Sequence, residues 1–96
     1  MALTPARFAE RRERVRAALS GADTFIVTDL CNIRYLSGFS GSNAVLVIGR
    51  DAESDAIGTD TRYQDQVAAE SPGLPVLLDR DTLPFVLASV GSALGT

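Results

Sequence analysis

Five consecutive apolar residues at positions 44–48, Ala-Val-Leu-Val-Ile, constrain the fold of this chain more than any other feature. A short run rich in branched aliphatic side chains is typical of a β-strand. The polar segment 50–54 after it has the composition of a turn, and residues 55–60 form a second strand candidate. The sequence therefore predicts a β-hairpin over residues 43–60.

Helical and extended segments alternate along the rest of the chain. Pro5 suits the first position of a helix, and Gly21 supplies a stop for it. The further elements are, in chain order, a helix before Gly21, a strand at 24–28, a short helix or turn ending at Gly38, a helix at 61–70, a strand at 75–79 and a helix from residue 81 or 82. One antiparallel hairpin combined with crossover helices predicts an α/β fold, a mixed β-sheet flanked by helices.

The last predicted helix carries an apolar stripe without a strand after it. The stripe consists of Leu83, Val86, Leu87, Val90 and Leu94. We expect one domain over residues 1–96 that is incomplete at its carboxy end. An uncovered sheet edge or apolar stripe promotes association, so we also expect a homo-oligomer.

Charge is distributed unevenly. Residues 1–20 hold five Arg and two acidic residues, whereas the rest holds four Arg and ten acidic residues. Glu10 lies four residues before Arg14 and Glu13 three before Arg16, so these charges pair on one helix. These paired charges favour a solvated helix face over a nucleic-acid surface. The chain also has no apolar run long enough for a membrane span. A single cysteine and the lack of a leader pattern predict a soluble, cytoplasmic protein.

The residue types exclude several kinds of active site. The sequence has no His and no Lys, which removes the commonest general base and the lysine of a Walker phosphate loop. Asp51, Asp55 and Asp60 surround a turn, where acids usually form the turn itself and not a metal site. We interpret Cys31 as a small buried hydrophobe and Asp79 and Asp81 as helix-capping residues. No catalytic residue and no metal ligand is therefore assigned.

Two motifs resemble the amino-terminal domain of Xaa-Pro aminopeptidases and Xaa-Pro dipeptidases (family M24), which is shared with creatinase. In the first, NIRYLSGFSGS, the matching residues are Asn32, Tyr35, Leu36, Ser37, Gly38, Phe39, Gly41 and Ser42. In the second, TDTRYQDQV, the matching residues are Thr59, Asp60, Arg62 and Tyr63, with Gln66 near the expected Gln and Val67 where Ala is usual. The order and spacing of both motifs make the resemblance specific.

The resemblance implies a ribonuclease-H-like fold without nuclease chemistry. It also implies a parent enzyme whose separate "pita-bread" catalytic domain holds two divalent metals, usually manganese, on two Asp, one His and two Glu. The domain itself would build the oligomer and restrict entry to the catalytic cleft, with its own catalytic domain as partner. The alternative is a stand-alone interaction module derived from the domain. A small hydrolase in its own right is the weakest of the three interpretations.

The resemblance implies that the loop after Gly38 forms the rim of the substrate cleft. The rim candidates are Phe39, Ser40, Gly41, Ser42, Asn43 and Arg62. In creatinase the corresponding loop supplies an Arg and an aromatic group, but this loop has no Arg, which favours a peptidase. Packing in the core is favoured over substrate contact for Tyr35, Leu36 and Phe39, and an ion pair with Asp60 or another acid is favoured for Arg62.

Overall fold

A computed structural model describes residues 5–18, 24–80, 82–84 and 86–87. Its helices are α1 (Pro5–Ala18), α2 (Leu30–Ser37) and α3 (Gln64–Glu70), with two short 3₁₀ turns, η1 (Ala52–Ser54) and η2 (Thr61–Tyr63). Its strands are β1 (Phe25–Val27), β2 (Ala44–Ile48), β3 (Ala56–Thr59) and β4 (Val76–Leu78). Residues 82–84 and 86–87 are helical. No described helix has the length and apolar content needed to span a bilayer.

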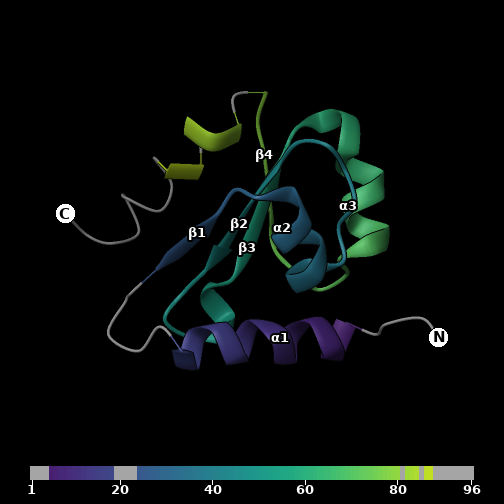
Figure 1. Ribbon diagram of the computed structural model, residues 1–96. Helices are drawn as coiled ribbons and strands as arrows, with labels where there is room; N and C mark the ends of the chain where they lie inside the picture. Colours follow the sequence, from purple (N-terminus) through teal and green to yellow (C-terminus); the bar gives the residue numbers. More distant parts are fainter. Residues whose placement is uncertain (1–4, 19–23, 81, 85, 88–96) are drawn as a thin grey trace.

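The four strands form one sheet in the order β1-β2-β3-β4. β1 and β3 both pair antiparallel with β2, with Ile26 opposite Val47 and Leu46 opposite Ile57, whereas β4 runs parallel to β3. The predicted hairpin at 43–60 and the mixed sheet are therefore confirmed. Figure 1 shows α1 across one end of the sheet, with α2 and α3 over one face.

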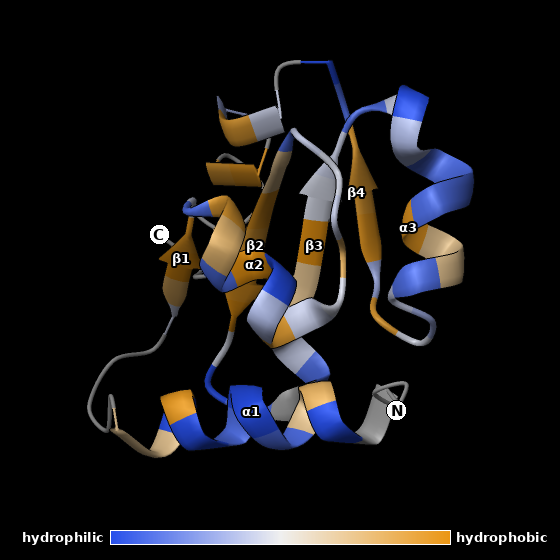
Figure 2. Ribbon diagram, turned by 45° about the vertical axis from the view of Figure 1, so that its right-hand side comes forward, coloured by the Kyte–Doolittle hydropathy of each residue, from blue (hydrophilic) through white to orange (hydrophobic). Residues whose placement is uncertain are grey.

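β2 is buried along its whole length because both faces of the sheet are covered. Leu46 and Ile48 belong to the larger core, which α2 and α3 help to enclose, whereas Val45 and Val47 pack with Val86 on the opposite face. This two-sided burial explains the uninterrupted apolar run in β2. Figure 2 shows orange, apolar segments in all four strands, whereas α1, α2 and α3 carry blue, hydrophilic segments.

α2 begins and ends with capping interactions that its sequence encodes. The carboxylate of Asp29 accepts hydrogen bonds from the backbone N–H groups of Cys31 and Asn32. Gly38 ends the helix with φ of 85°, a left-handed conformation that favours glycine, and its N–H donates to the carbonyl of Arg34. The helix predicted to end at Gly38 is thus confirmed.

Three local expectations differ from the structure. Cys31 is exposed and not buried. Tyr35 is 53% exposed and not part of the core, and its ring packs against the guanidinium of Arg11 from α1. The segment 61–70 is a 3₁₀ turn followed by α3, because Asp60 caps the backbone N–H of Arg62 and starts the tighter turn first.

At the chain's ends only part of each predicted helix is described. The stop at Gly21 and the cap at Asp81 lie outside the described residues, as do Val90 and Leu94. Of the predicted stripe, Val86 is fully buried, while Leu83 and Leu87 are 41% and 49% exposed.

Candidate functional site

The loop 38–43 joins α2 to β2 and lies against the segment that follows β3. Phe39 is only 1% exposed, and its ring meets that of Tyr63 edge to face with 5.6 Å between centroids. Gly41 is buried against the same ring, so close that an added Cβ would lie 2.3 Å from Phe39 Cζ. These two members of the predicted rim therefore support the loop from inside. Core packing, which was favoured for Leu36 and Phe39, is confirmed, since Leu36 is 5% exposed.

Asn43 and Arg62 meet on the carboxylate of Asp60. The Asn43 amide donates to Asp60 Oδ2 over 2.7 Å, and Arg62 donates to both carboxylate oxygens over 3.0 and 2.9 Å. The ion pair predicted for Arg62 is confirmed. The hydrogen bonds from Arg62 and then Asn43 hold the pKa of Asp60 well below its usual value.

The exposed serines of the loop are bound to η2 and α3. The hydroxyl of Ser42 shares a short hydrogen bond with that of Tyr63, and this contact lowers the pKa of Tyr63. Ser40 donates from its backbone N–H and its hydroxyl to Glu70, which also accepts from Gln66. Partial burial opposes the ionisation of Glu70, but the hydrogen bonds from Ser40 and Gln66 outweigh it and lower the pKa of Glu70.

This arrangement forms a rigid polar surface. Ser40, Ser42 and the Arg62 side chain, which is 72% exposed, are presented to solvent while their polar atoms are held by neighbours. Among the described residues, no three His, Cys, Asp or Glu side chains are grouped so that they could hold a metal ion. The surface can therefore supply hydrogen bonds and one cation to a ligand, and it contains no pair of nucleophile and base.

Asp55 forms a separate buried centre that the sequence did not reveal. It is 2% exposed, and its carboxylate lies 3.0 Å from Arg12 Nε and 2.8 Å from Arg16 Nη1. It also accepts a hydrogen bond from the backbone N–H of Gly49. The hydrogen bond to Asp55 is the main reason that the pKa of Arg16 is raised. We interpreted Asp55 as a turn former, but it joins α1 to the hairpin.

The charged face of α1 is only partly the solvated surface that was expected. The predicted pair of Glu13 and Arg16 is confirmed at 2.7 Å, but Glu10 pairs with Arg7 at 3.6 Å and not with Arg14. Arg7 lies three residues before Glu10 on the same face, which makes it an equivalent neighbour. Two arginines of this helix, Arg12 and Arg16, turn inward to Asp55.

Comparison with known families places the chain. The model of the Creatinase/Prolidase N-terminal domain matches residues 11–96. The chain belongs to this family. The creatinase N-terminal fold class, with its mixed sheet flanked by helices, is thereby confirmed.

Solved structures of the same domain agree with this assignment. The N-terminal creatinase/prolidase-like domain of a protein described as a metallopeptidase from Corynebacterium diphtheriae is 44% identical, with a TM-score of 0.80 over 85% of this chain and 67% of that chain. The N-terminal domain of the cytoplasmic peptidase PepQ from Mycobacterium tuberculosis H37Rv is 36% identical, with a TM-score of 0.77 over 94% of this chain and 68% of that chain.

A curated relative extends far beyond the length matched here. The uncharacterized peptidase YqhT of Bacillus subtilis (strain 168) is 35% identical over 57 residues, which is 59% of this chain. The matched region spans 16% of the length of YqhT.

Proposed function

We propose that this creatinase/prolidase N-terminal domain is the non-catalytic part of a metal-dependent Xaa-Pro aminopeptidase or dipeptidase. The family match over residues 11–96 carries the proposal, and the described peptidase relatives support it. The two divalent metals, manganese by resemblance, would be held by a catalytic domain. The described part of this chain does not fit them, because it groups no set of metal-ligating side chains.

Within such an enzyme, the loop 38–43 and Arg62 would form the rim that restricts the catalytic cleft. This proposal is supported by the hydrogen bonds and the ion pair that hold the polar groups of these residues in place. Asp60 holds Asn43 and Arg62 from one side, and Glu70 holds Ser40 from the other. A rim that is already ordered excludes a badly fitting peptide without an entropy cost at each binding event.

The domain would also take part in a homo-oligomer and act in the cytoplasm. Exposed Phe25 on the edge strand β1, together with exposed Leu30 and Leu87, supports self-association. The family match equally fits the alternative, a stand-alone interaction module. Light scattering of the purified chain at millimolar concentration tests the association, and a strict monomer would contradict it.

The deciding experiment is to sequence the codons after Thr96 and to assay the encoded protein. A following domain with two Asp, one His and two Glu, together with manganese-dependent cleavage of Xaa-Pro peptides, supports the peptidase. A stop codon would favour the interaction module. In a full-length enzyme, Arg62→Gln should raise KM several-fold, while the exposed control Arg80→Gln should leave it unchanged.

A further inference from the structure

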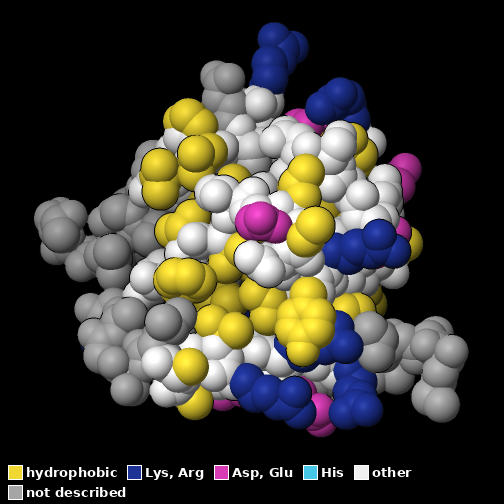
Figure 3. All heavy atoms as spheres, in the orientation of Figure 1, with side chains coloured by type: hydrophobic (Ala, Val, Ile, Leu, Met, Phe, Trp, Pro, Cys, Tyr) yellow, Lys and Arg dark blue, Asp and Glu magenta, His cyan; other side chains and the backbone are white. Residues whose placement is uncertain are grey.

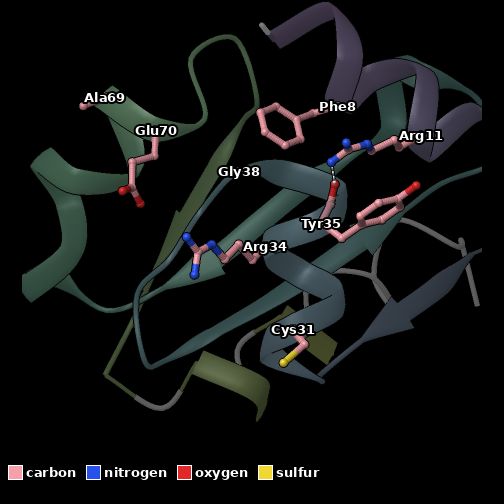
Figure 4. A pocket seen from close by; sticks show the side chains of 8 residues that line it. All are labelled: Phe8, Arg11, Cys31, Arg34, Tyr35, Gly38, Ala69 and Glu70. Carbon is pink, nitrogen blue, oxygen red and sulfur yellow. Dashed lines mark hydrogen bonds between the residues drawn. The ribbon is translucent and has the colours of Figure 1, made fainter. Parts of the chain in front are cut away.

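A cleft of about 670 Å³ lies where α1, α2 and α3 meet. Gly38, at the start of the candidate rim loop, also lines it. Its walls include Phe8 and Arg11 from α1, Arg34 and Tyr35 from α2, and Glu70 from α3. In Figure 4 the Arg34 side chain extends toward the side where Glu70 lies, and the Phe8 ring and the Arg11–Tyr35 pair occupy the other side.

One side of the cleft is a preformed aromatic and cationic wall. The guanidinium carbon of Arg11 lies 4.1 Å from the centroid of the Tyr35 ring and 5.4 Å from that of Phe8. Arg11 Nη1 also donates to the backbone carbonyl of Tyr35 over 2.9 Å. These contacts fix Arg11 and keep Tyr35 in place although it is half exposed. Tyrosine and arginine in such an arrangement are enriched where proteins bind ligands and partners.

The opposite side offers the guanidinium of Arg34, whose positive charge also helps to lower the pKa of Glu70. Glu70 is engaged by Ser40 and Gln66. Arg34 has no ion pair and no side-chain hydrogen bond to any residue in the described part of the chain, and it is exposed beside the cleft. The cleft therefore holds two guanidinium groups and one carboxylate, which favours an anionic ligand. A planar guanidinium matches a carboxylate through two parallel hydrogen bonds.

We propose that this cleft binds an organic carboxylate that carries an apolar group. Arg34 holds the carboxylate, and the Phe8 and Tyr35 rings contact the apolar group. The proposal does not depend on peptidase activity of any parent enzyme. The carboxy-terminal residue of a peptide and a free aromatic acid share this chemistry, so both are used as probes.

Cys31 gives a direct measurement of occupancy. It is the only cysteine of the chain, it is exposed, and it lines the same cleft. The rate at which iodoacetamide alkylates Cys31 is measured with and without N-acetyl-alanyl-phenylalanine, 3-phenylpropanoate and the amide of each. Calorimetric titration of the same probes measures binding itself.

We expect both acids to bind and to slow alkylation at least about fivefold, and the amides to bind about tenfold more weakly. Protection by the peptide acid alone identifies a peptide end as the ligand, and equal protection identifies any apolar carboxylate. Arg34→Gln should abolish the difference between acid and amide, whereas Arg14→Gln, outside the cleft on α1, should retain it. Glu70→Gln should tighten the binding of both acids, because it removes the opposing charge.

Three results would overturn the proposal. The first is that neither acid, at 10 mM, gives binding heat or slows the alkylation of Cys31. That concentration is about tenfold above a millimolar Kd. The second is equal binding of acid and amide, and the third is unchanged discrimination in Arg34→Gln. Rates are compared with and without ligand within each variant, and circular dichroism confirms that each variant is folded.

Discussion

Arg16 Nη1 lies 2.8 Å from Asp55 Oδ1, which connects the last turns of α1 to the start of β3 across 39 positions of the chain. Arg12 contacts the other oxygen of the same carboxylate, and all three side chains are largely withdrawn from solvent. Removing the shared carboxylate of a buried ion cluster takes away the main partner of the charges that remain.

Asp55→Asn should therefore lower the free energy of unfolding by about 3 kcal/mol. The measurement is urea denaturation followed by circular dichroism. Glu53→Gln removes a nearby charge from an exposed position and should change stability by less than about 0.5 kcal/mol. An equal effect of both substitutions would contradict the role of Asp55.

Phe39→Ala should destabilise the fold by about 3–5 kcal/mol, because it removes a ring that is 1% exposed from the core. Leu30→Ala, a truncation at a position that is 42% exposed, should cost less than about 1 kcal/mol. Both values come from chemical denaturation. A stable Phe39→Ala variant with altered peptide kinetics in a full-length enzyme would show instead that the ring contacts substrate.

Gly41→Ala should destabilise the loop by about 1–3 kcal/mol, because the new methyl group would lie 2.3 Å from the Phe39 ring. Phe39→Leu makes room for that methyl group, so the two substitutions together should cost less than the sum of their separate effects. A double-mutant cycle measures this coupling. Strict additivity would place the clash elsewhere.

The stability of the domain should fall as the pH is lowered from about 5 to 2, partly through Asp60. Its pKa in the folded chain lies below the usual value of 3.8, so the unfolded chain takes up the proton first as the pH falls. Asp60 therefore stabilises the fold fully above about pH 5, and this contribution decreases progressively as the pH falls below about 4 toward the lower pKa of the folded chain. Asp60→Asn should be less stable than the wild type at pH 6, and the difference should shrink at pH 2.

Asn43→Ala provides a graded control for this pH dependence. It removes one of the donors to Asp60 but leaves the ion pair with Arg62, so its slope of stability against pH should be intermediate. Thermal denaturation at half-unit pH intervals gives the three slopes. Identical slopes in wild type and Asp60→Asn would show that other carboxylates account for the acid sensitivity.

Local sequence patterns were sufficient to predict the hairpin and the end of α2. β2 and β3 are consecutive apolar segments with a polar turn between them, and Gly38 marks a left-handed cap. The motif from Thr59 to Tyr63 also pointed to the ion pair of Asp60 and Arg62, since two residues of opposite charge lie two positions apart.

Contacts between distant segments could not be predicted in this way. The letters around Asp55 describe a turn, and nothing in them shows that α1 lies across it and supplies two arginines. The same helix supplies Arg11, which packs against the exposed ring of Tyr35. Figure 3 shows the resulting face, where hydrophobic side chains gather over its middle and basic side chains lie below and beside them. The direction of a side chain depends on this tertiary arrangement, which residue type alone does not encode.

The strand order β1-β2-β3-β4 has a consequence for how the domain folds. Each strand pairs with its neighbour in the chain, but only β2 and β3 are joined by a short turn, whereas β1 reaches β2 through α2 and β4 reaches β3 through α3. Short loop closures favour fast folding. We expect β2 and β3 to form the folding nucleus and to retain their amide hydrogens longest during exchange, with α1 docking afterwards onto a hairpin that already exists.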